Sequence, residues 1–596
     1  MATLLILGGL RAVSAEPEPT LRPLIAVEGS DLAQRRMTDL QEAVGRSQWG
    51  RAVELVEGLR DADPLNLEVR RGTFRNVTRE IDRIVPHFPE VLTRLRKRMT
   101  TADTRWREIS QRPIISDADE RGCEEFLARF WLSPHAPEAS WKLAESAWRR
   151  GDWETARRHL LPLIRSSADT NNEQKDHDDW RFPEVTAELQ TRAATLLARI
   201  ETSPRDRGIS PGPFFGAVAW TSHPSTAELP VVAKEHVVFS SSRSIRVVNL
   251  ADGQAAWPAE IPDDDGTIVS LNDDGKSLKA NESSLFSPVI ANGRLLAGLR
   301  DGEDVRRSER LVCCELRGAE GRVVWTQLLN EVSGLGDHRI VSDPLAIPGG
   351  WCFGVERQVP PHRLSVLCIR DTSGEREWIC DLGTRVLGTP SSANLYSPAQ
   401  VGLRYAAGRI YVDSGAEAAA CLDRAGRMLW ITVCPPHPTL ATAEKYQARS
   451  SPVFHSGRVT IISSDNRGLR CFSAETGELL WDRRLPVGVI SVIVGEDGNL
   501  IASGKMLWGI EAQTGRILWS TGFAENGLGS PAVLVGSSVL WASGDELWQV
   551  ESRDGRLQNR MPLKRWEMST VRQIQVSADH LLLTNSSTTA VRFQCR

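Results

Sequence analysis

The chain has 596 residues, and its 72 lysines and arginines nearly balance its 76 aspartates and glutamates, for a formal net charge of −4. This balance gives no support for the strongly basic surface that is typical of nucleic-acid-binding domains, so we expect no nucleic-acid partner. No long apolar run of the kind that spans a bilayer occurs, and we therefore expect no transmembrane segment. The length leaves room for several domains.

Residues 1–15 have the apolar and cleavage regions of a secretory signal. Val13 and Ala15 stand at the two small-residue positions before Glu16. The basic start is missing and Arg11 interrupts the apolar run, so an uncleaved segment or a displaced start is the alternative. We predict a signal peptide, and hence a periplasmic or secreted protein.

Residues 30–202 are predicted to form a helical domain, because apolar residues recur there with a period of 3.6 residues. Two stretches resemble tetratricopeptide units, with small residues where paired helices touch and aromatic residues filling the gaps. They are Gly45…Trp49…Ala52…Pro64 and Ala144…Trp148…Trp153…Ala156. Such a domain binds proteins or peptides, or packs against its neighbour, and the sequence leaves both open.

Residues 203–213 are predicted to be a linker, since their prolines and glycines cannot continue a helix. A long insertion further on carries two acidic stretches, 263–266 and 272–275, without the glycine and bidentate glutamate of an EF-hand loop. Gly275-Lys-Ser277 resembles the end of a phosphate-binding loop, but Ser270 stands where the first glycine is required. Neither stretch is a predicted site.

From residue 214 to residue 596, a glycine followed four residues later by a tryptophan recurs at intervals of 37 to 68 residues. The seven complete units are Gly216/Trp220, Gly253/Trp257, Gly321/Trp325, Gly374/Trp378, Gly426/Trp430, Gly477/Trp481 and Gly515/Trp519, and an eighth at Gly555 has Asn559 in place of the tryptophan. A fixed core with variable loops at this period is the signature of a radial β array.

Each unit is predicted to contain about four short strands. Glycine takes the positive-φ position of a hairpin turn between two alternating runs. The prolines at 230, 288, 344, 452 and 531 each precede a second strand-like run. Four strands in each of eight units predict an eight-bladed β-propeller over residues 214–596, in which the seven tryptophans are wedges between neighbouring blades.

Two further expectations follow from the repeat. We expect the segment around 214–220 to meet the final run 590–593 in the closing blade, because pairing of the chain ends removes an exposed sheet edge. We also expect residues 214–596 to fold without the helical domain, since the repeats form their own closed core.

These motifs resemble the quinoprotein-type propeller repeat, whose signature is Ala-x-Asp-x-x-Thr-Gly-x-x-x-Trp. Thr476-Gly477 and Thr514-Gly515 match it best, with Ser473 and Glu511 at the aspartate position. The family includes dehydrogenases that bind pyrroloquinoline quinone (PQQ), and non-catalytic propellers such as the lipoprotein of the outer-membrane barrel-assembly machinery. The fold therefore does not decide the function.

The cysteines point to packing rather than to chemistry. None of the ten is in a Cys-x-x-Cys pair, so no structural zinc site is expected. Cys368, Cys421 and Cys471 each lie in the strand before a Gly/Trp turn, as small buried apolar residues do. Cys352 and Cys368 flank a Pro-Pro pair almost symmetrically, so they are candidates to face each other across a hairpin, and whether they form a disulfide stays open.

The quinoprotein alcohol dehydrogenases carry a vicinal disulfide under the cofactor, which invites comparison with Cys313-Cys314. Here the pair lies in an alternating apolar strand rather than in a loop, and no local motif carries over the calcium ligands or the base aspartate. We therefore predict no catalytic, cofactor-binding or metal-ligating residues.

Together, these patterns predict a helical-repeat domain followed by an eight-bladed propeller. We expect a monomeric, non-catalytic binding or assembly scaffold of the cell envelope, with an unknown protein partner and no cofactor. The alternative is a PQQ-dependent periplasmic dehydrogenase, which alone requires PQQ and calcium. A third interpretation is a regulatory sensor domain.

Overall fold

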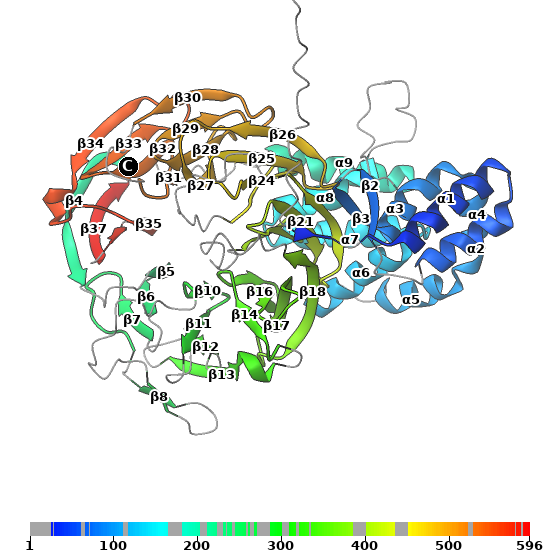
Figure 1. The fold of residues 1–596 in the computed structure, drawn as a ribbon, viewed down its shortest axis with the longest axis horizontal. Helices are drawn as coiled ribbons and strands as arrows, with labels where there is room; N and C mark the ends of the chain where they lie inside the picture. The colour runs from blue at the N-terminus through cyan, green and yellow to red at the C-terminus, as the bar shows by residue number, and fades with distance from the viewer. Residues whose placement is uncertain are drawn as a thin grey trace, which may run out of the picture.

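The fold was analysed in a computed structural model. It describes residues 25–595 apart from 28, 61–65, 71, 111–116, 165–181, 203–210, 223–229, 234, 241–244, 258–259, 263–267, 271–285, 301–308, 317–320, 333–334, 386–400, 436–450, 523–528, 578–579 and 586–587. The predicted signal peptide and both acidic stretches of the insertion lie outside the described residues. A helical N-terminal region stands beside a ring of antiparallel sheets (Figure 1).

The helical region contains neighbouring helices that pack in pairs, as α1 with α2 and α7 with α8. Its described helices are α1 (Asp31–Gly45), α2 (Trp49–Arg60), α3 (Val77–Ile84), α4 (Pro89–Arg98), α5 (Thr100–Ser110), α6 (Asp117–Phe130), α7 (Ala136–Arg149), α8 (Trp153–Ile164) and α9 (Ala187–Thr202), with a short η1 (Val85–His87). Trp153, expected to fill a gap between helices, leaves 42% of its surface exposed. The region also holds a hairpin that the sequence analysis missed, β2 (Asn66–Arg70) and β3 (Thr73–Asn76).

The first half of the ring contains four sheets that follow one another in chain order. They are β5 (Val231–Ala233), β6 (His236–Ser240) and β7 (Ile245–Asn249); β10 (Val289–Ala291), β11 (Arg294–Arg300), β12 (Glu309–Glu315) and β13 (Arg322–Leu328); β14 (His338–Ile340), β15 (Leu345–Ile347), β16 (Gly350–Arg357), β17 (Arg363–Arg370) and β18 (Arg376–Arg385); and β19 (Gly402–Ala406), β20 (Arg409–Asp413), β21 (Ala418–Asp423) and β22 (Met428–Val433). A separate pair, β8 (Glu260–Pro262) and β9 (Ile268–Ser270), follows β7, and η2 (Leu329–Glu331) follows β13.

The second half continues in the same way to the C-terminus. Its sheets are β23 (Val453–His455), β24 (Arg458–Ile462), β25 (Gly468–Ser473) and β26 (Leu479–Arg484); β27 (Val489–Val494), β28 (Leu500–Gly504), β29 (Leu507–Ile510) and β30 (Ile517–Thr521); β31 (Val533–Val535), β32 (Ser538–Ser543), β33 (Glu546–Glu551) and β34 (Leu557–Pro562); and β35 (Gln573–Ser577), β36 (His580–Thr584), β37 (Thr588–Cys595) and β4 (Pro211–Ser222). The short η4 (Leu563–Trp566) lies between β34 and β35.

The last strand of the chain closes the ring on its first strand. β37 pairs with β4, with Ala590 opposite Trp220 and Val591 opposite Val218, which confirms the predicted pairing of the chain ends. β4 already begins at Pro211, so the last three residues of the predicted linker belong to this strand.

Each of the seven tryptophans lies against the turn glycine of the next unit. The pairs are Trp220 with Gly253, Trp257 with Gly321, Trp325 with Gly374, Trp378 with Gly426, Trp430 with Gly477, Trp481 with Gly515 and Trp519 with Gly555. A β-carbon built on Gly515 would stand only 2.7 Å from the Trp481 ring, and the φ of Gly515 is +71°, so this turn needs glycine for both space and conformation.

Several of these indoles also donate a hydrogen bond across to the next sheet. The N–H groups of Trp220, Trp325, Trp378, Trp430 and Trp481 donate to the backbone carbonyls of Leu250, Asp371, Arg424, Ala474 and Ala512, at 2.7–3.1 Å. A buried indole N–H needs such a partner. The repeat of glycine and tryptophan therefore links neighbouring sheets around the ring.

A small residue stands directly opposite the tryptophan on the adjoining strand of the same sheet. Trp325, Trp378, Trp430, Trp481, Trp519 and Trp220 face Cys313, Cys368, Cys421, Cys471, Gly509 and Ala590. These small residues leave room for the ring. In the degenerate unit, Asn559 faces Gln549, so both positions of the pair differ from those of the other units.

This register makes a prediction for the degenerate unit. Asn559→Trp alone should lower the free energy of unfolding by about 1–3 kcal/mol, because buried Gln549 already fills the space opposite. Adding Gln549→Cys should recover most of that loss by restoring the pairing of the other units. Urea unfolding of the two variants is the measurement, with Gln549→Cys alone as the control. Equal stability of the single and double variants would contradict the prediction.

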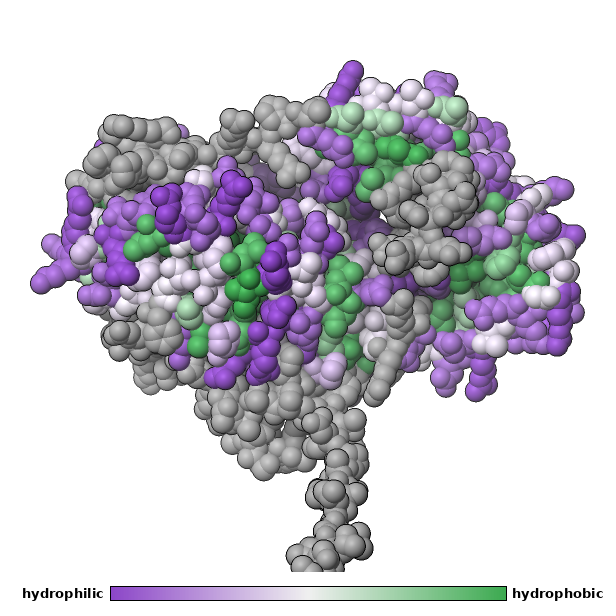
Figure 2. All heavy atoms as spheres, turned by 90° about the horizontal axis from the view of Figure 1, so that it is seen from above, coloured by the Kyte–Doolittle hydropathy of each residue, from purple (hydrophilic) through white to green (hydrophobic). Residues whose placement is uncertain are grey.

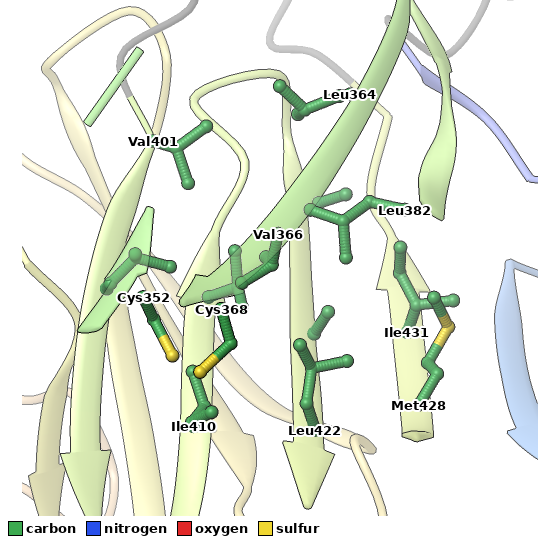
Figure 3. Close-up of a cluster of buried hydrophobic side chains, with 14 of the residues drawn as sticks. Cys352, Leu364, Val366, Cys368, Leu382, Val401, Ile410, Leu422, Met428 and Ile431 are labelled. Atoms are coloured by element: carbon green, nitrogen blue, oxygen red, sulfur yellow. The ribbon is translucent and has the colours of Figure 1, made fainter. Parts of the chain in front are cut away.

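The largest apolar cluster of the ring lies between the sheet of β16–β18 and the sheet of β19–β22 (Figure 3). It includes Cys352 and Cys368, which are opposite each other in the β16–β17 ladder, as expected. Both are buried thiols in this structure.

The helical region is joined to the ring by shared sheets. β3 pairs with β22, with Phe74 opposite Ile431 and Thr73 opposite Thr432, so the hairpin extends the β19–β22 sheet. The short β1 (Ile25–Ala26) likewise pairs with β18. The hairpin lies where the helices meet the ring (Figure 1). The region predicted as a separate helical domain therefore contributes strands to one ring sheet, and the segment that precedes it contributes a strand to another.

Candidate functional site

A cleft of about 1580 Å³ lies between the helical region and the rim of the ring, and we call it the interdomain cleft. One wall comes from α3, α6 and α8. The other comes from β18 and from the turns at β19–β20, β21–β22, β23–β24 and β25–β26. Its lining includes eleven arginines and nine carboxylates, so it carries a small excess of positive charge.

Beside the cleft, the helical region docks on the Gly477 turn. Arg75 Nε donates to the backbone oxygen of Thr476 at 3.1 Å, and Thr432 Oγ1 donates to that of Gly477 at 2.6 Å. Asn76 at the end of β3 caps α3 by accepting from the backbone N–H of Thr78. The cap starts α3 directly against the ring.

Glu475 in this turn binds two arginines from opposite sides of the cleft. Arg79 of α3 forms an ion pair with one of its carboxylate oxygens, and Arg409 of β20 donates to both oxygens at 2.6 and 3.1 Å. Burial alone raises the pKa of Glu475, but the attraction of Arg409 and Arg79 outweighs it and lowers that pKa to about 2. Glu475 is therefore ionised and holds the two domains together.

This cluster predicts an acid-sensitive contribution to stability. The folded-state pKa of Glu475 lies below its ordinary value of 4.5, so the stabilisation is present above about pH 4.5 and is lost as pH falls towards about 2. Glu475→Gln should therefore cost about 1–3 kcal/mol at pH 7, and progressively less below pH 4.5. Urea unfolding at several pH values measures this, with exposed Glu496→Gln as the control. A pH-independent cost would contradict the prediction.

Arg158 is held over the cleft by its neighbours on α7 and α8. Asp152 caps α8 by accepting from the backbone N–H of Thr155 at 3.1 Å, which fixes the first turn of that helix. One terminal nitrogen of Arg158 lies 2.7 Å from Nε2 of His159. A β-carbon built on Gly408, in the β19–β20 turn, would be 2.8 Å from that same nitrogen. Arg158 thus reaches from the helical wall to the ring wall.

The protonation state of His159 follows from this contact. A guanidinium cannot accept a hydrogen bond, so His159 Nε2 accepts from Arg158. The other ring nitrogen, Nδ1, then carries the proton and donates to Ser140 Oγ at 3.3 Å, while Ser140 Oγ donates to the backbone oxygen of His159 at 2.9 Å. Burial, together with Arg158 and Arg409, lowers the pKa of His159 well below its ordinary value. His159 is neutral and positions Arg158.

Within the described part of the chain, four arginines of the cleft form no ion pair. They are Arg129, Arg157 and Arg158 on the helical wall and Arg458 on the ring wall. The Nε atoms of Arg158 and Arg458 are buried without a hydrogen-bond partner. Burial lowers the pKa of Arg158, and repulsion from Arg409 adds to this. Buried N–H donors without a partner are uncommon in folded proteins.

Carboxyl groups without an ion pair also line the cleft, among them Glu124 on α6 and Glu154 on α8. Burial raises the pKa of Glu124 on α6 to about 7, although Arg424 and Arg158 act in the opposite direction. Glu124 is thus only partly ionised at neutral pH, and it cancels less than one positive charge. Glu377 is already paired with Arg121 at 2.7 Å. The unpaired arginines therefore determine the electrostatic character of the cleft.

The sequence-predicted residues lie mostly elsewhere. Of the seven tryptophans, Trp378 lines the cleft. Cys313 and Cys314 are buried side by side in β12, where successive side chains point to opposite faces, and they pack into two different apolar clusters. They cannot bond to each other without breaking the strand. Among the described residues, no group of three or more histidines, cysteines or acids is placed to hold a metal ion.

No helix in the described ranges is long and apolar enough to cross a membrane.

Residues 362–494 and 469–594 match a family described as "Outer membrane protein assembly factor BamB". The chain thus carries the repeat domain of BamB-like and PQQ-type propellers together with an N-terminal helical region. No curated protein sequence matches the chain.

Among solved structures, BamB from Moraxella catarrhalis is 14% identical with a TM-score of 0.40, covering 63% of this chain and 99% of its own. A quinohemoprotein alcohol dehydrogenase from Comamonas testosteroni is 12% identical with a TM-score of 0.42, covering 63% of this chain and 76% of its own. Both an assembly factor and an enzyme thus resemble the ring to a similar degree, and these weak likenesses do not distinguish between the two functions.

Proposed function

We propose that the chain is a protein-binding scaffold of the cell envelope, exported to the periplasm or beyond, whose helical region and ring bind a partner together. The observation that carries this proposal is the interdomain cleft. Its walls are held together by the pairing of β3 with β22 and by Glu475 between Arg79 and Arg409. A cleft of about 1580 Å³ exceeds the roughly 300–1,000 Å³ of small-molecule sites, so it suits a segment of another chain.

We further propose that the ring is a monomeric propeller of eight blades and that the helical hairpins are divergent tetratricopeptide-like units. In this interpretation the three-stranded β5–β7 sheet is the blade that precedes the turn before Trp257. The match of residues 362–594 to a family named for an assembly factor supports a role in binding proteins.

The alternative, a PQQ-dependent dehydrogenase, finds less support. Beyond the shared repeat, the local feature that invites comparison with these enzymes is Cys313-Cys314, and these thiols point to opposite faces of β12. A vicinal disulfide therefore does not fit this strand.

The two functions are separated by one pair of assays on the full-length chain. We expect no dye reduction with primary alcohols after addition of PQQ and calcium. We also expect that the tagged protein, cross-linked in envelope extract, retains the same partner at a constant ratio across preparations. Quinone-dependent turnover, or the lack of any partner at a constant ratio, would overturn the scaffold proposal.

A further inference from the structure

The interdomain cleft has unpaired positive charge on both of its walls. Arg157 and Arg158 project from α8, and Arg458 begins β24 on the opposite side. Arg79, Arg158 and Arg409 lie close enough to influence each other electrostatically, and Glu475 is their nearest shared carboxylate. Glu475, together with the partly ionised Glu124 near Arg158, neutralises these three guanidinium groups only in part, and the remaining positive charge is only weakly screened in such a partly buried site.

Arg158 is arranged to receive an anion. Its side chain is fixed by neutral His159 and by contact with Gly408, so little rotamer freedom remains to be lost on binding. Its Nε atom has no partner within the described residues. An arginine held in one orientation with free donors matches the geometry of a carboxylate or other oxyanion.

The rest of the lining limits what can carry that anion. Apolar and aromatic side chains stand between the arginines, among them Trp131, Leu161, Tyr411 and Phe454. In Figure 2 the face seen from above is largely hydrophilic with separate hydrophobic patches, rather than one continuous apolar surface. An occupant therefore needs apolar groups spaced between acidic groups along an extended shape.

We propose that the interdomain cleft binds an acidic peptide segment of a partner protein, with a carboxylate of that segment on Arg158 and a second one towards Arg458. This assignment rests on the proposed scaffold function and names the chemistry of its partner. The excess positive charge of the cleft also speeds the approach of such a segment. Binding should weaken as salt is added.

The test uses the full-length protein and a short labelled peptide in which glutamate and leucine alternate. We expect the peptide to bind, and its glutamine–leucine counterpart to bind at least about tenfold more weakly. Arg158→Gln and Arg458→Gln, on opposite walls, should each weaken binding about tenfold, and Arg158→Lys should recover part of the loss. Arg556→Gln, on an exposed turn outside the cleft, is the matched control. Circular dichroism and thermal unfolding verify that each variant is folded.

Three results would overturn the proposal. One is equal binding of the acidic and neutral peptides. Another is unchanged binding by both folded cleft variants. The third is binding of inorganic phosphate at low concentration with no binding of the acidic peptide, which would assign the cleft to a small anion. If the cross-linked partner is still retained in any of these cases, the scaffold function stands and only its acidic-peptide recognition fails.

Discussion

Trp481→Ala should lower the free energy of unfolding of the ring by about 3–5 kcal/mol, the cost of emptying a large buried aromatic site. Trp481 leaves 9% of its surface exposed, lies over Gly515, and donates its indole N–H to Ala512 at 3.1 Å. The substitution removes packing within one sheet and the link to the next sheet at once.

Trp519→Ala should cost less, because Trp519 is only half-buried. From the sequence alone an equal loss is expected at both positions, since the two units match most closely. Urea unfolding followed by circular dichroism is the measurement. Trp153→Ala is the control, because 42% of that side chain is exposed and it lies outside the ring. If Trp481→Ala unfolds at the same urea concentration as the parent, the tryptophans are not wedges between sheets.

The repeat could be predicted because its defining residues lie close together in the sequence. The turn glycine indicates a backbone conformation, and the tryptophan four residues later indicates a packing contact. The residue opposite the tryptophan on the adjoining strand, such as Cys421 or Cys471, also lies just before the turn in the sequence. The pairing of β37 with β4 was predictable for a similar reason, since closure removes an edge.

The interdomain cleft could not be predicted, because its residues are far apart in the chain. Arg79, Arg158 and Arg409 belong to no local motif, Glu475 occupies a position that the repeat signature leaves unspecified, and the near-zero net charge conceals their gathering. Only the fold brings them together. A residue such as His159, which acts by holding Arg158, carries no sequence signature of that role.

The docking of the β2–β3 hairpin did leave a signal, in the composition of β22. The outer strands β26, β30 and β34 are largely exposed, and β26 reads Leu-Leu-Trp-Asp-Arg-Arg. β22 reads Met-Leu-Trp-Ile-Thr-Val and is largely buried. The apolar residues after Trp430 mark a strand whose edge is covered by β3, 350 or so residues earlier in the chain.

Deletion of the helical region should therefore leave residues 203–596 prone to aggregation, without a cooperative unfolding transition at the stability of the full chain. Loss of β3 uncovers the edge of β22 at Trp430, Ile431 and Thr432, and an apolar sheet edge is a template for pairing with other chains. It also removes Arg79 from Glu475. This expectation replaces the independent folding that the linker composition suggests.

A double substitution in β22 should have opposite effects in the ring fragment and in the full chain. Ile431→Asp with Thr432→Arg copies the Asp482 and Arg483 that follow Trp481 in β26. In the fragment the change should raise solubility, because charges protect an open edge. In the full chain it should lower stability, because Ile431 and Thr432 face Phe74 and Thr73 of β3 and both are buried.

Solubility after expression, followed by urea unfolding of both backgrounds, measures the two effects. The fragment without the substitutions could instead be soluble and unfold as cooperatively as the full chain. That result would show that the ring folds alone and that β3 is not needed for its stability. The alternative result is that the substitutions raise the solubility of the fragment and lower the stability of the full chain. The two charged side chains would then be tolerated only when β3 is absent. In that case β22 is an interior strand of one structure that the helical region and the ring share.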